Sequence, residues 1–228
     1  MLISHSHRFI FIHVGKTGGM SMREVLKQYA EEPEKFKIRR PTKMNGDRPN
    51  PLYTVWETLL LHAKARDVQK EVPAGLFDSF YKFAFVRNPW DLMVSMYHFI
   101  LREPTAPRHE QVAAAGSFDG FVDWVGATAD PFPKGITKLQ SEMLTDDQGR
   151  LLVDYIGHYE RLEEDFAHVA AKVGIADRLP HLNRSQHKDY RTYYSDRTRE
   201  LVGDCFRTDI DLFGYSFDGL REPVEAGQ

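Results

Sequence analysis

The sequence predicts one α/β domain, a three-layer sandwich around a central parallel sheet, and three observations carry this prediction. Residues 9–14, apart from His13, and residues 83–86 are apolar runs, and each leads through a short turn into a helical pattern. Such runs are typical of strands buried on both faces, as in parallel sheets. The chain has 228 residues, which is enough for a single core of this kind. Because it shows no internal repeat or linker, we expect one domain over residues 1–220 and a flexible tail at 221–228.

The composition excludes several classes of protein. A formal net charge of −3 argues against a general nucleic-acid binder. No stretch is long and apolar enough for stable membrane insertion, and because Met1 lies close to the first strand we expect no signal peptide. Cys205 is the only cysteine, so an intramolecular disulfide is excluded and a reducing, cytoplasmic setting is expected. The ten histidines form no set with metal-ligand spacing.

The first strand ends in a turn suited to an anion, and its residues are Gly15-Lys16-Thr17-Gly18-Gly19-Met20-Ser21. Its glycines let several backbone N–H groups converge, and the helix that follows adds its free amides and the positive end of its dipole. A lysine at the rim supplies a mobile charge. A Walker loop would require glycine at the position of Ile10, which argues against that interpretation. The alternative is an ordinary strand–turn–helix with a solvated lysine.

The next segments are predicted from their periodicity and their breakers. Apolar residues at helical spacing extend the first helix to about residue 30. Residues 31–51 are polar and basic with several prolines, which predicts a loop-rich excursion. The basic residues between 35 and 48 suit either an anionic acceptor or a solvated surface. Residues 53–70 are predicted as a helix that carries His62.

The second apolar run, 83–86, places Arg87 at the carboxyl end of a strand, where open α/β sheets bind ligands. Asn88 is a good N-cap for the helix that follows. Arginine offers a planar fork for phosphate, and Ser95 can donate a hydroxyl. Alternatively, Arg87 pairs with a carboxylate and Ser95 bonds back to its own helix.

The remaining elements follow in order. Residues 103–116 are predicted as a surface insertion, and Ser117 opens a short helix. Another helix runs through residues 139–144, and residues 151–156 are predicted as a strand. An amphipathic helix over 162–173 ends at Gly174, and the last helix contains residues 201–206.

Two motifs together resemble those of a known family. The sequence Lys16-Thr17-Gly18-Gly19-x-Ser21 resembles the 5′-phosphosulfate loop of sulfotransferases that use 3′-phosphoadenosine-5′-phosphosulfate (PAPS). Arg87-Asn88-Pro89, with Ser95 and Tyr97, resembles the 3′-phosphate motif of the carbohydrate sulfotransferase superfamily. The end of the chain is also similar, with Asn183-x-Ser185, Tyr193-Tyr194, a terminal helix and Phe213-Gly214-Tyr215. The resemblance covers nearly the whole chain and implies a fold like that of the P-loop nucleotide hydrolases.

This resemblance implies a sulfotransferase that moves a sulfuryl group from PAPS to a hydroxyl, or an amine, of an acceptor, and the acceptor is expected to be a saccharide. It implies no metal, because cationic side chains and amides do the work often given to Mg²⁺. The chain departs from the pattern at Gly15, where proline is common, and at Met20, where threonine is common. These departures suggest a looser strand exit and one lost hydroxyl contact.

The resemblance also implies roles for particular residues. Lys16 acts in catalysis and, with Thr17, Gly18, Gly19, Met20 and Ser21, holds the 5′ side of the donor. Arg87 and Ser95 hold the 3′-phosphate, with Arg184 and Ser185 as further nucleotide contacts. His62 is placed like the base histidine of the uronyl 2-O-sulfotransferases, and a histidine can titrate near neutral pH.

Alternatives remain for the base and for the function. The alternative for His62 is a packed core histidine, Glu24 is a weaker base candidate, and His13 is expected to serve a structural hydrogen bond. The alternative functions are a non-catalytic nucleotide- or saccharide-binding module and an ATP-dependent phosphotransferase.

Overall fold

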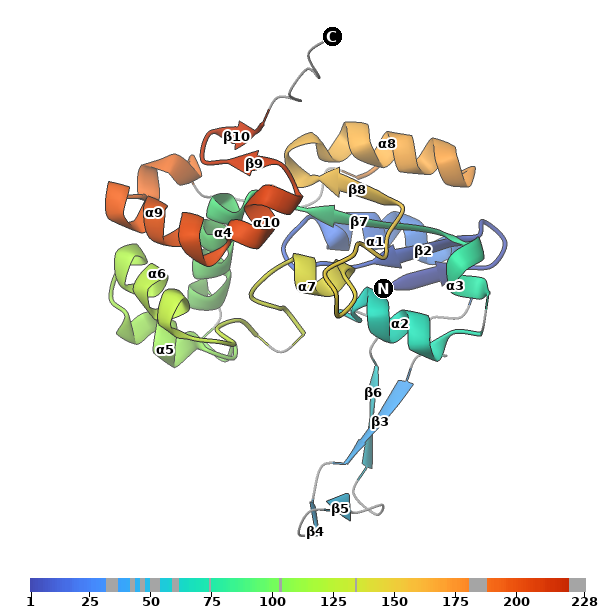
Figure 1. The fold of residues 1–228 in the computed structure, drawn as a ribbon, viewed down its shortest axis with the longest axis horizontal. Coiled ribbons are helices and arrows are strands. Elements are labelled where there is room, and N and C mark those ends of the chain that lie inside the picture. The colour runs from blue at the N-terminus through green and yellow to red at the C-terminus, as the bar shows by residue number, and fades with distance from the viewer. Residues whose placement is uncertain are drawn as a thin grey trace.

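The computed structural model describes residues 1–31, 37–41, 44–45, 48–49, 54–58, 62–73, 75–102, 104–133, 135–180 and 188–221. Its central sheet has the strand order β1-β2-β7-β8 (Figure 1). The four strands are β1 (Leu2–Ser4), β2 (Phe9–Ile12), β7 (Tyr81–Val86) and β8 (Tyr155–His158). The last three run parallel, and β1 pairs antiparallel with β2 at the edge. The predicted α/β class with a parallel sheet is confirmed, and β1 is an edge strand that the sequence did not indicate.

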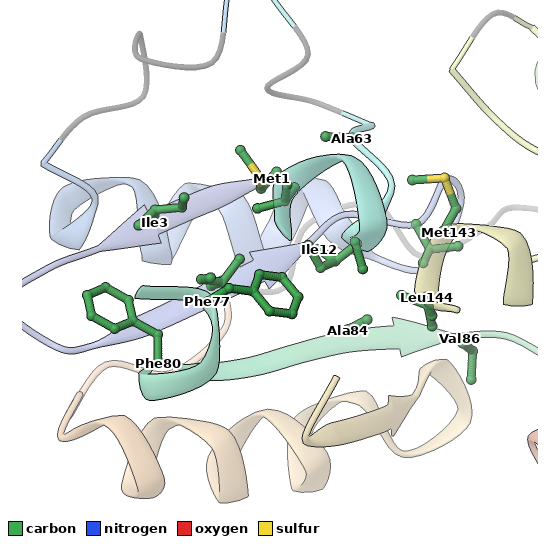
Figure 2. Packing of buried hydrophobic residues seen from close by; sticks show 14 of the residues in the cluster. Met1, Ile3, Ile12, Ala63, Phe77, Phe80, Ala84, Val86, Met143 and Leu144 are labelled. Carbon is green, nitrogen blue, oxygen red and sulfur yellow. The ribbon is translucent and has the colours of Figure 1, made fainter. Parts of the chain in front are cut away.

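Alternation along the strands divides the sheet into two unlike faces. Phe9, Phe11, Phe83 and Phe85 form an aromatic face, which packs against α1 (Gly19–Leu26) and α8 (Leu162–Val173). The opposite face is aliphatic, with Ile10, Ile12, Ala84 and Val86 (Figure 2). That face is covered by α2 (Ala65–Glu71), α3 (Leu76–Ser79) and α7 (Ser141–Leu144). Helices therefore cover both faces, and the three-layer prediction is confirmed.

A second core lies beyond the carboxyl ends of the parallel strands, where a group of helices gathers (Figure 1). These are α4 (Pro89–Arg102), α5 (His109–Ala114), α6 (Phe118–Ala127), α9 (Asp196–Cys205) and α10 (Arg207–Leu212). The insertion predicted at 103–116 contributes to this core, because α5 buries Val112 there. The chain then forms a short hairpin of β9 (Tyr215–Ser216) and β10 (Gly219–Leu220).

Most predicted boundaries hold where local signals are strong. The first helix continues as the 3-10 turn η1 (Lys27–Tyr29), close to the predicted end. Ser117 caps α6 by accepting a hydrogen bond from the Gly120 amide at 3.1 Å. Helix α8 ends as predicted at Gly174, whose φ of 73° is left-handed. The late strand is shifted, because β8 begins at Tyr155 while Leu151 forms an isolated bridge with Thr145.

The prediction of a helix over 53–70 is wrong for its first part. Residues Thr54–Thr58 form strand β6, which pairs antiparallel with β3 (Lys37–Pro41). The predicted loop-rich excursion also contains β4 (Met44–Asn45) and β5 (Arg48–Pro49), paired with each other. The β-branched and aromatic residues of β6 suit a strand, and a partner strand distant in sequence decides between strand and helix. The helix begins only at Ala65, so His62 lies in the turn before it.

In the part of the chain that the structure describes, no helix is long and apolar enough to cross a membrane.

Candidate active site

The loop between β2 and α1 folds into a closed turn at the carboxyl edge of the sheet. Lys16 and Gly18 have φ values of 65° and 78°, in the left-handed region. The Thr17 hydroxyl donates to the Val14 carbonyl at 3.0 Å, and the Ser21 amide donates to the Gly18 carbonyl at 3.0 Å. The Thr17 hydroxyl and the Ser21 amide therefore hold the turn itself. The amides of Ser21 and Met22 both bond the Gly18 carbonyl, so those of Gly19 and Met20 are the amides at the start of α1 that suit an anion.

Two glycines of the loop allow close packing from other elements. A Cβ at Gly15 would lie 2.9 Å from Ile136, and a Cβ at Gly18 would lie 2.9 Å from Leu162. Glycine at position 15 therefore lets the Ile136 side chain pack against the end of the strand. This packing, rather than a looser strand exit, accounts for glycine where proline is common in the family pattern. Met20, at the other departure, has a side chain that is 61% exposed.

Lys16 is the cation of the loop. Its Nζ atom lies 4.3 Å from the centre of the Phe99 ring on α4. Burial, together with the nearby charges of Arg87 and Arg102, lowers the pKa of Lys16 to about 8. An ammonium held among other cations is stabilised by a bound anion, so the electrostatics of this region favour a negatively charged ligand.

Arg87 connects the second motif to the loop. Its Nη1 atom donates to the Lys16 carbonyl at 3.2 Å, and its Nε atom donates to Asp91 at 2.8 Å. The guanidinium also stacks on the Tyr159 ring, 4.0 Å from its centre, and the residue is only 2% exposed. The carboxylate pairing weighed as an alternative is therefore present, and the contact with the loop exists beside it.

One face of α4 runs along the loop. Asp91, Ser95 and Phe99 recur every four residues, so they share that face. The first contacts Arg87 and the last contacts Lys16, which places the buried Ser95 between the two cations. The structure thus brings together the lysine, the arginine and the serine that the sequence singled out.

A buried polar network fixes the backbone of Arg87, and sequence reasoning missed it. The Gln140 amide accepts from the Arg87 N–H at 2.9 Å and donates to the Arg87 carbonyl at 2.8 Å. Asp209 on α10 accepts from the N–H groups of Gln140 at 2.6 Å and of Ser141 at 2.9 Å. Burial raises the pKa of Asp209, against the effect of these hydrogen bonds. The available signal was an acid at core spacing between Phe206 and Phe213.

A second carboxylate anchors the next residue. Glu160 accepts from the Asn88 N–H at 2.7 Å and from the Tyr215 hydroxyl at 2.8 Å. Asn88 caps α4 as predicted, accepting from the Trp90 amide at 3.0 Å. Gly214, with a φ of 71°, turns the chain so that Tyr215 reaches this carboxylate. The Phe-Gly-Tyr ending therefore supports the second motif directly.

His62 lies against the strand exit. Its Nδ1 atom is 3.2 Å from the His13 carbonyl, and a Cβ at Gly135 would lie 3.2 Å from the His62 Cβ. A carbonyl only accepts, so Nδ1 carries the proton of the neutral ring and Nε2 is the basic nitrogen. Burial lowers the pKa of His62, which keeps the ring neutral near pH 7.

His13 lies beneath the loop and is 3% exposed. Burial lowers its pKa to about 2, so the ring is neutral. Among the described residues, its Nδ1 atom has no hydrogen-bond partner. The structural hydrogen bond expected of this side chain is therefore not made at Nδ1. The backbone carbonyl of His13 accepts from His62 instead, and the two rings lie 4.8 Å apart between centres.

The remaining candidates lie elsewhere. Glu24 is exposed on α1 and pairs with Lys27 at 2.6 Å, which leaves it a surface residue. Arg184 and Ser185 lie outside the described residues. Within the described ranges, no three histidine, cysteine, aspartate or glutamate side chains are grouped to hold a metal ion.

A surface hollow of about 520 Å³ lies between α9, α10 and the C-terminal hairpin. Its lining includes Trp90, Arg199 and Phe217, and none of the loop residues. Its charged groups are largely paired with one another, as in the Arg221–Asp211 ion pair at 3.2 Å. The chemistry described above is therefore separate from this hollow.

The sheet edge thus brings together a loop with a lysine, a clamped arginine and a neutral histidine, an arrangement that suits a negatively charged ligand. A model of the sulfotransferase family matches residues 1–216, and the chain belongs to this family, whose chemistry is sulfuryl transfer. An uncharacterized protein of Archaeoglobus fulgidus is 32% identical over 127 residues, covering 54% of this chain and 93% of that protein.

Two solved structures are also similar. Mouse sulfotransferase SULT7A1 complexed with PAP has 13% identity and a TM-score of 0.46, covering 92% of this chain and 86% of that one. A sulfotransferase from Alicyclobacillus acidocaldarius has 15% identity and a TM-score of 0.42, covering 92% and 97%.

Proposed function

We propose that this protein transfers a sulfuryl group from PAPS to a hydroxyl, or an amine, of an acceptor, and that the acceptor is a saccharide. The observation that carries the proposal is the hydrogen bond from Arg87 to the Lys16 carbonyl, which joins the two phosphate motifs in one site. Membership of the sulfotransferase family supports the reaction type. The saccharide rests on the resemblance of the Arg87–Tyr97 segment to carbohydrate sulfotransferases.

The residues present fit a nucleotide with two phosphate groups. The start of α1 and the Lys16 ammonium suit the 5′ group, because backbone amides and a cation converge there. Asp91 and Tyr159 hold the Arg87 guanidinium in place, so its positive charge has a fixed position. Ser95 lies on the same face of α4 as Asp91. These two residues suit the 3′-phosphate. Arg184 and Ser185 are proposed as additional nucleotide contacts.

The roles of the side chains follow from their charge and geometry. When bound, PAPS supplies the sulfuryl group on a phosphate leaving group. Lys16 stabilises the negative charge that develops on the leaving oxygen, as preorganised cations do in phosphoryl transfer. His62 is proposed as the general base, because its carbonyl-bound Nδ1 leaves Nε2 to accept the acceptor proton. No metal ion is required for these roles.

A reducing, cytoplasmic setting is part of the proposal. Cys205 is a free, half-buried thiol on α9, and the sequence contains no second cysteine with which to pair.

The proposal is tested by thermal unfolding with 3′-phosphoadenosine-5′-phosphate (PAP), the donor without its sulfuryl group. At 100 times its Kd, a ligand stabilises the fold by about 2.7 kcal/mol, which raises Tm by roughly 5–10 °C in a domain of this size. We expect a shift of this size with PAP and a much smaller one with ATP and Mg²⁺. Equal shifts, or a larger one with ATP and Mg²⁺, would favour the phosphotransferase alternative and contradict the proposal.

A further inference from the structure

The ring of His13 occupies the space where residue 19 would carry a side chain. A Cβ built on Gly19 would lie 2.0 Å from both Cδ2 and Nε2 of His13. Gly19 does not have a positive φ, so the backbone conformation does not require glycine there. The requirement is close contact, because no other residue would leave room for the ring.

This contact joins the two ends of the anion-binding loop. His13 directly follows β2, and Gly19 is the first residue of α1. On its other side, the His13 ring stacks on Phe11 of the aromatic sheet face, with ring centres 5.8 Å apart. The imidazole therefore lies between the sheet and the first turn of α1.

The backbone of the same residue holds the proposed base. The His13 carbonyl accepts from His62 Nδ1 at 3.2 Å, and the two rings lie 4.8 Å apart between centres. One residue thus contacts both the start of α1, which faces the donor, and His62, which faces the acceptor in the proposed reaction.

We propose that His13 is a positioning residue, whose ring seats the first turn of α1 and aims the amides of Gly19 and Met20 at the donor, while its carbonyl orients His62. The inference rests on the proposed function for its ligand. Among the described residues the buried Nδ1 of His13 has no hydrogen-bond partner, which fits this role, because the ring is used for its shape and its neutral state rather than for a hydrogen bond.

The test adds a methyl group at position 19 and removes the imidazole at position 13, first separately and then together. Gly19→Ala adds the methyl group that meets the ring, and we expect PAP affinity to fall about 10- to 100-fold, the loss expected for one or two charge-assisted hydrogen bonds. In the double variant His13→Ala/Gly19→Ala the methyl has room, and we expect at least half of the lost affinity to return on a logarithmic scale. PAP affinity is measured by calorimetry at a temperature where each variant is folded.

Gly126→Ala is the matched control. Gly126 is also a helical glycine, but a Cβ there makes only ordinary contacts of 3.6 Å or more. We expect this variant to bind PAP as the wild type does, and His13→Ala to give it no gain in affinity. If the contact between His13 and Gly19 served only the stability of the fold, the variants would change Tm and the PAP affinity of the folded protein would stay the same.

Several outcomes would overturn the inference while the wild type still binds PAP. One is an unchanged PAP affinity in folded Gly19→Ala. Another is that His13→Ala and Gly19→Ala change the PAP affinity independently, so that their effects add in the double variant. If Gly19→Ala fails to fold, a folded double variant that binds PAP supports the inference. If neither Gly19→Ala nor the double variant folds, the PAP affinity of His13→Ala alone decides the question. An affinity equal to that of the wild type then counts against the positioning role of His13. A wild type that does not bind PAP contradicts the proposed function instead, and that result is distinct from all of these.

Discussion

Replacing Lys16 by alanine is expected to lower the rate of sulfuryl transfer roughly 10²- to 10³-fold, the usual loss for one preorganised group that stabilises developing charge. The affinity for PAP should fall much less, because the amides of α1 and Arg87 remain. The measurement is single-turnover transfer from PAPS, followed by mass, beside a calorimetric titration with PAP. A loss confined to affinity would mean that Lys16 only binds the donor.

The pH dependence gives this prediction a second check. The pKa of Lys16 in the free protein is about 8, and a bound anion raises it. PAP affinity should therefore be full below pH 8 and decline as the pH rises above it, since only the charged lysine attracts the anion. Lys16→Ala should lose this decline. Lys27→Ala is the control, because Lys27 is exposed and paired with Glu24.

His62→Ala in the same assays separates the base from the cation. We expect a lower transfer rate with PAP affinity unchanged, because the imidazole acts on the acceptor. Full activity in this variant would remove His62 from the mechanism.

Replacing Asp209 by alanine is expected to lower the free energy of unfolding by about 3–5 kcal/mol, because it leaves buried donors without an acceptor. These donors are the N–H groups of Gln140 and Ser141, which bond Asp209 at 2.6 and 2.9 Å. The loss also removes the anchor of Gln140, whose side-chain amide makes hydrogen bonds to both the N–H and the carbonyl of Arg87. Urea unfolding measures the change through the midpoint and slope.

Asp211→Ala is the matched control for this prediction. Asp211 lies on the same helix, but it is exposed and pairs with Arg221 on the surface at 3.2 Å. Its removal should cost about 0–1 kcal/mol, as for most exposed ion pairs. If Asp209→Ala destabilised the protein no more than this control, the buried network would not be what holds the end of β7.

Local signals predicted the parts of the site that depend on neighbours in sequence. The apolar run, the turn and the helix around Lys16 were found because each has its own pattern, and so was the Asn88 cap. Strand β6 was missed because its partner, β3, is far along the chain. The same holds for the Gln140 amide that bonds the backbone of Arg87. Asp209, which accepts from the Gln140 N–H, is distant in sequence and resembles a solvated acid of an amphipathic helix.

The sequence also left two interpretations of Arg87 open, phosphate binding and pairing with a carboxylate, and the structure shows the carboxylate pairing beside a hydrogen bond to the Lys16 carbonyl. The ion pair with Asp91 follows from their spacing of four residues. The hydrogen bond to the Lys16 carbonyl depends on the parallel pairing of β2 with β7, which brings the ends of both strands to one edge. Likewise, glycine at position 19 was assigned to loop flexibility, whereas only the structure shows the His13 ring beneath it.

A crystal structure of the complex with PAP tests most directly whether one nucleotide spans the loop and the end of β7. We predict the 5′-phosphate at the first turn of α1 beside Lys16, and the 3′-phosphate beside Arg87 and Ser95. A nucleotide bound away from this sheet edge, or touching one cation while the other faces a separate cavity, would contradict the assignment.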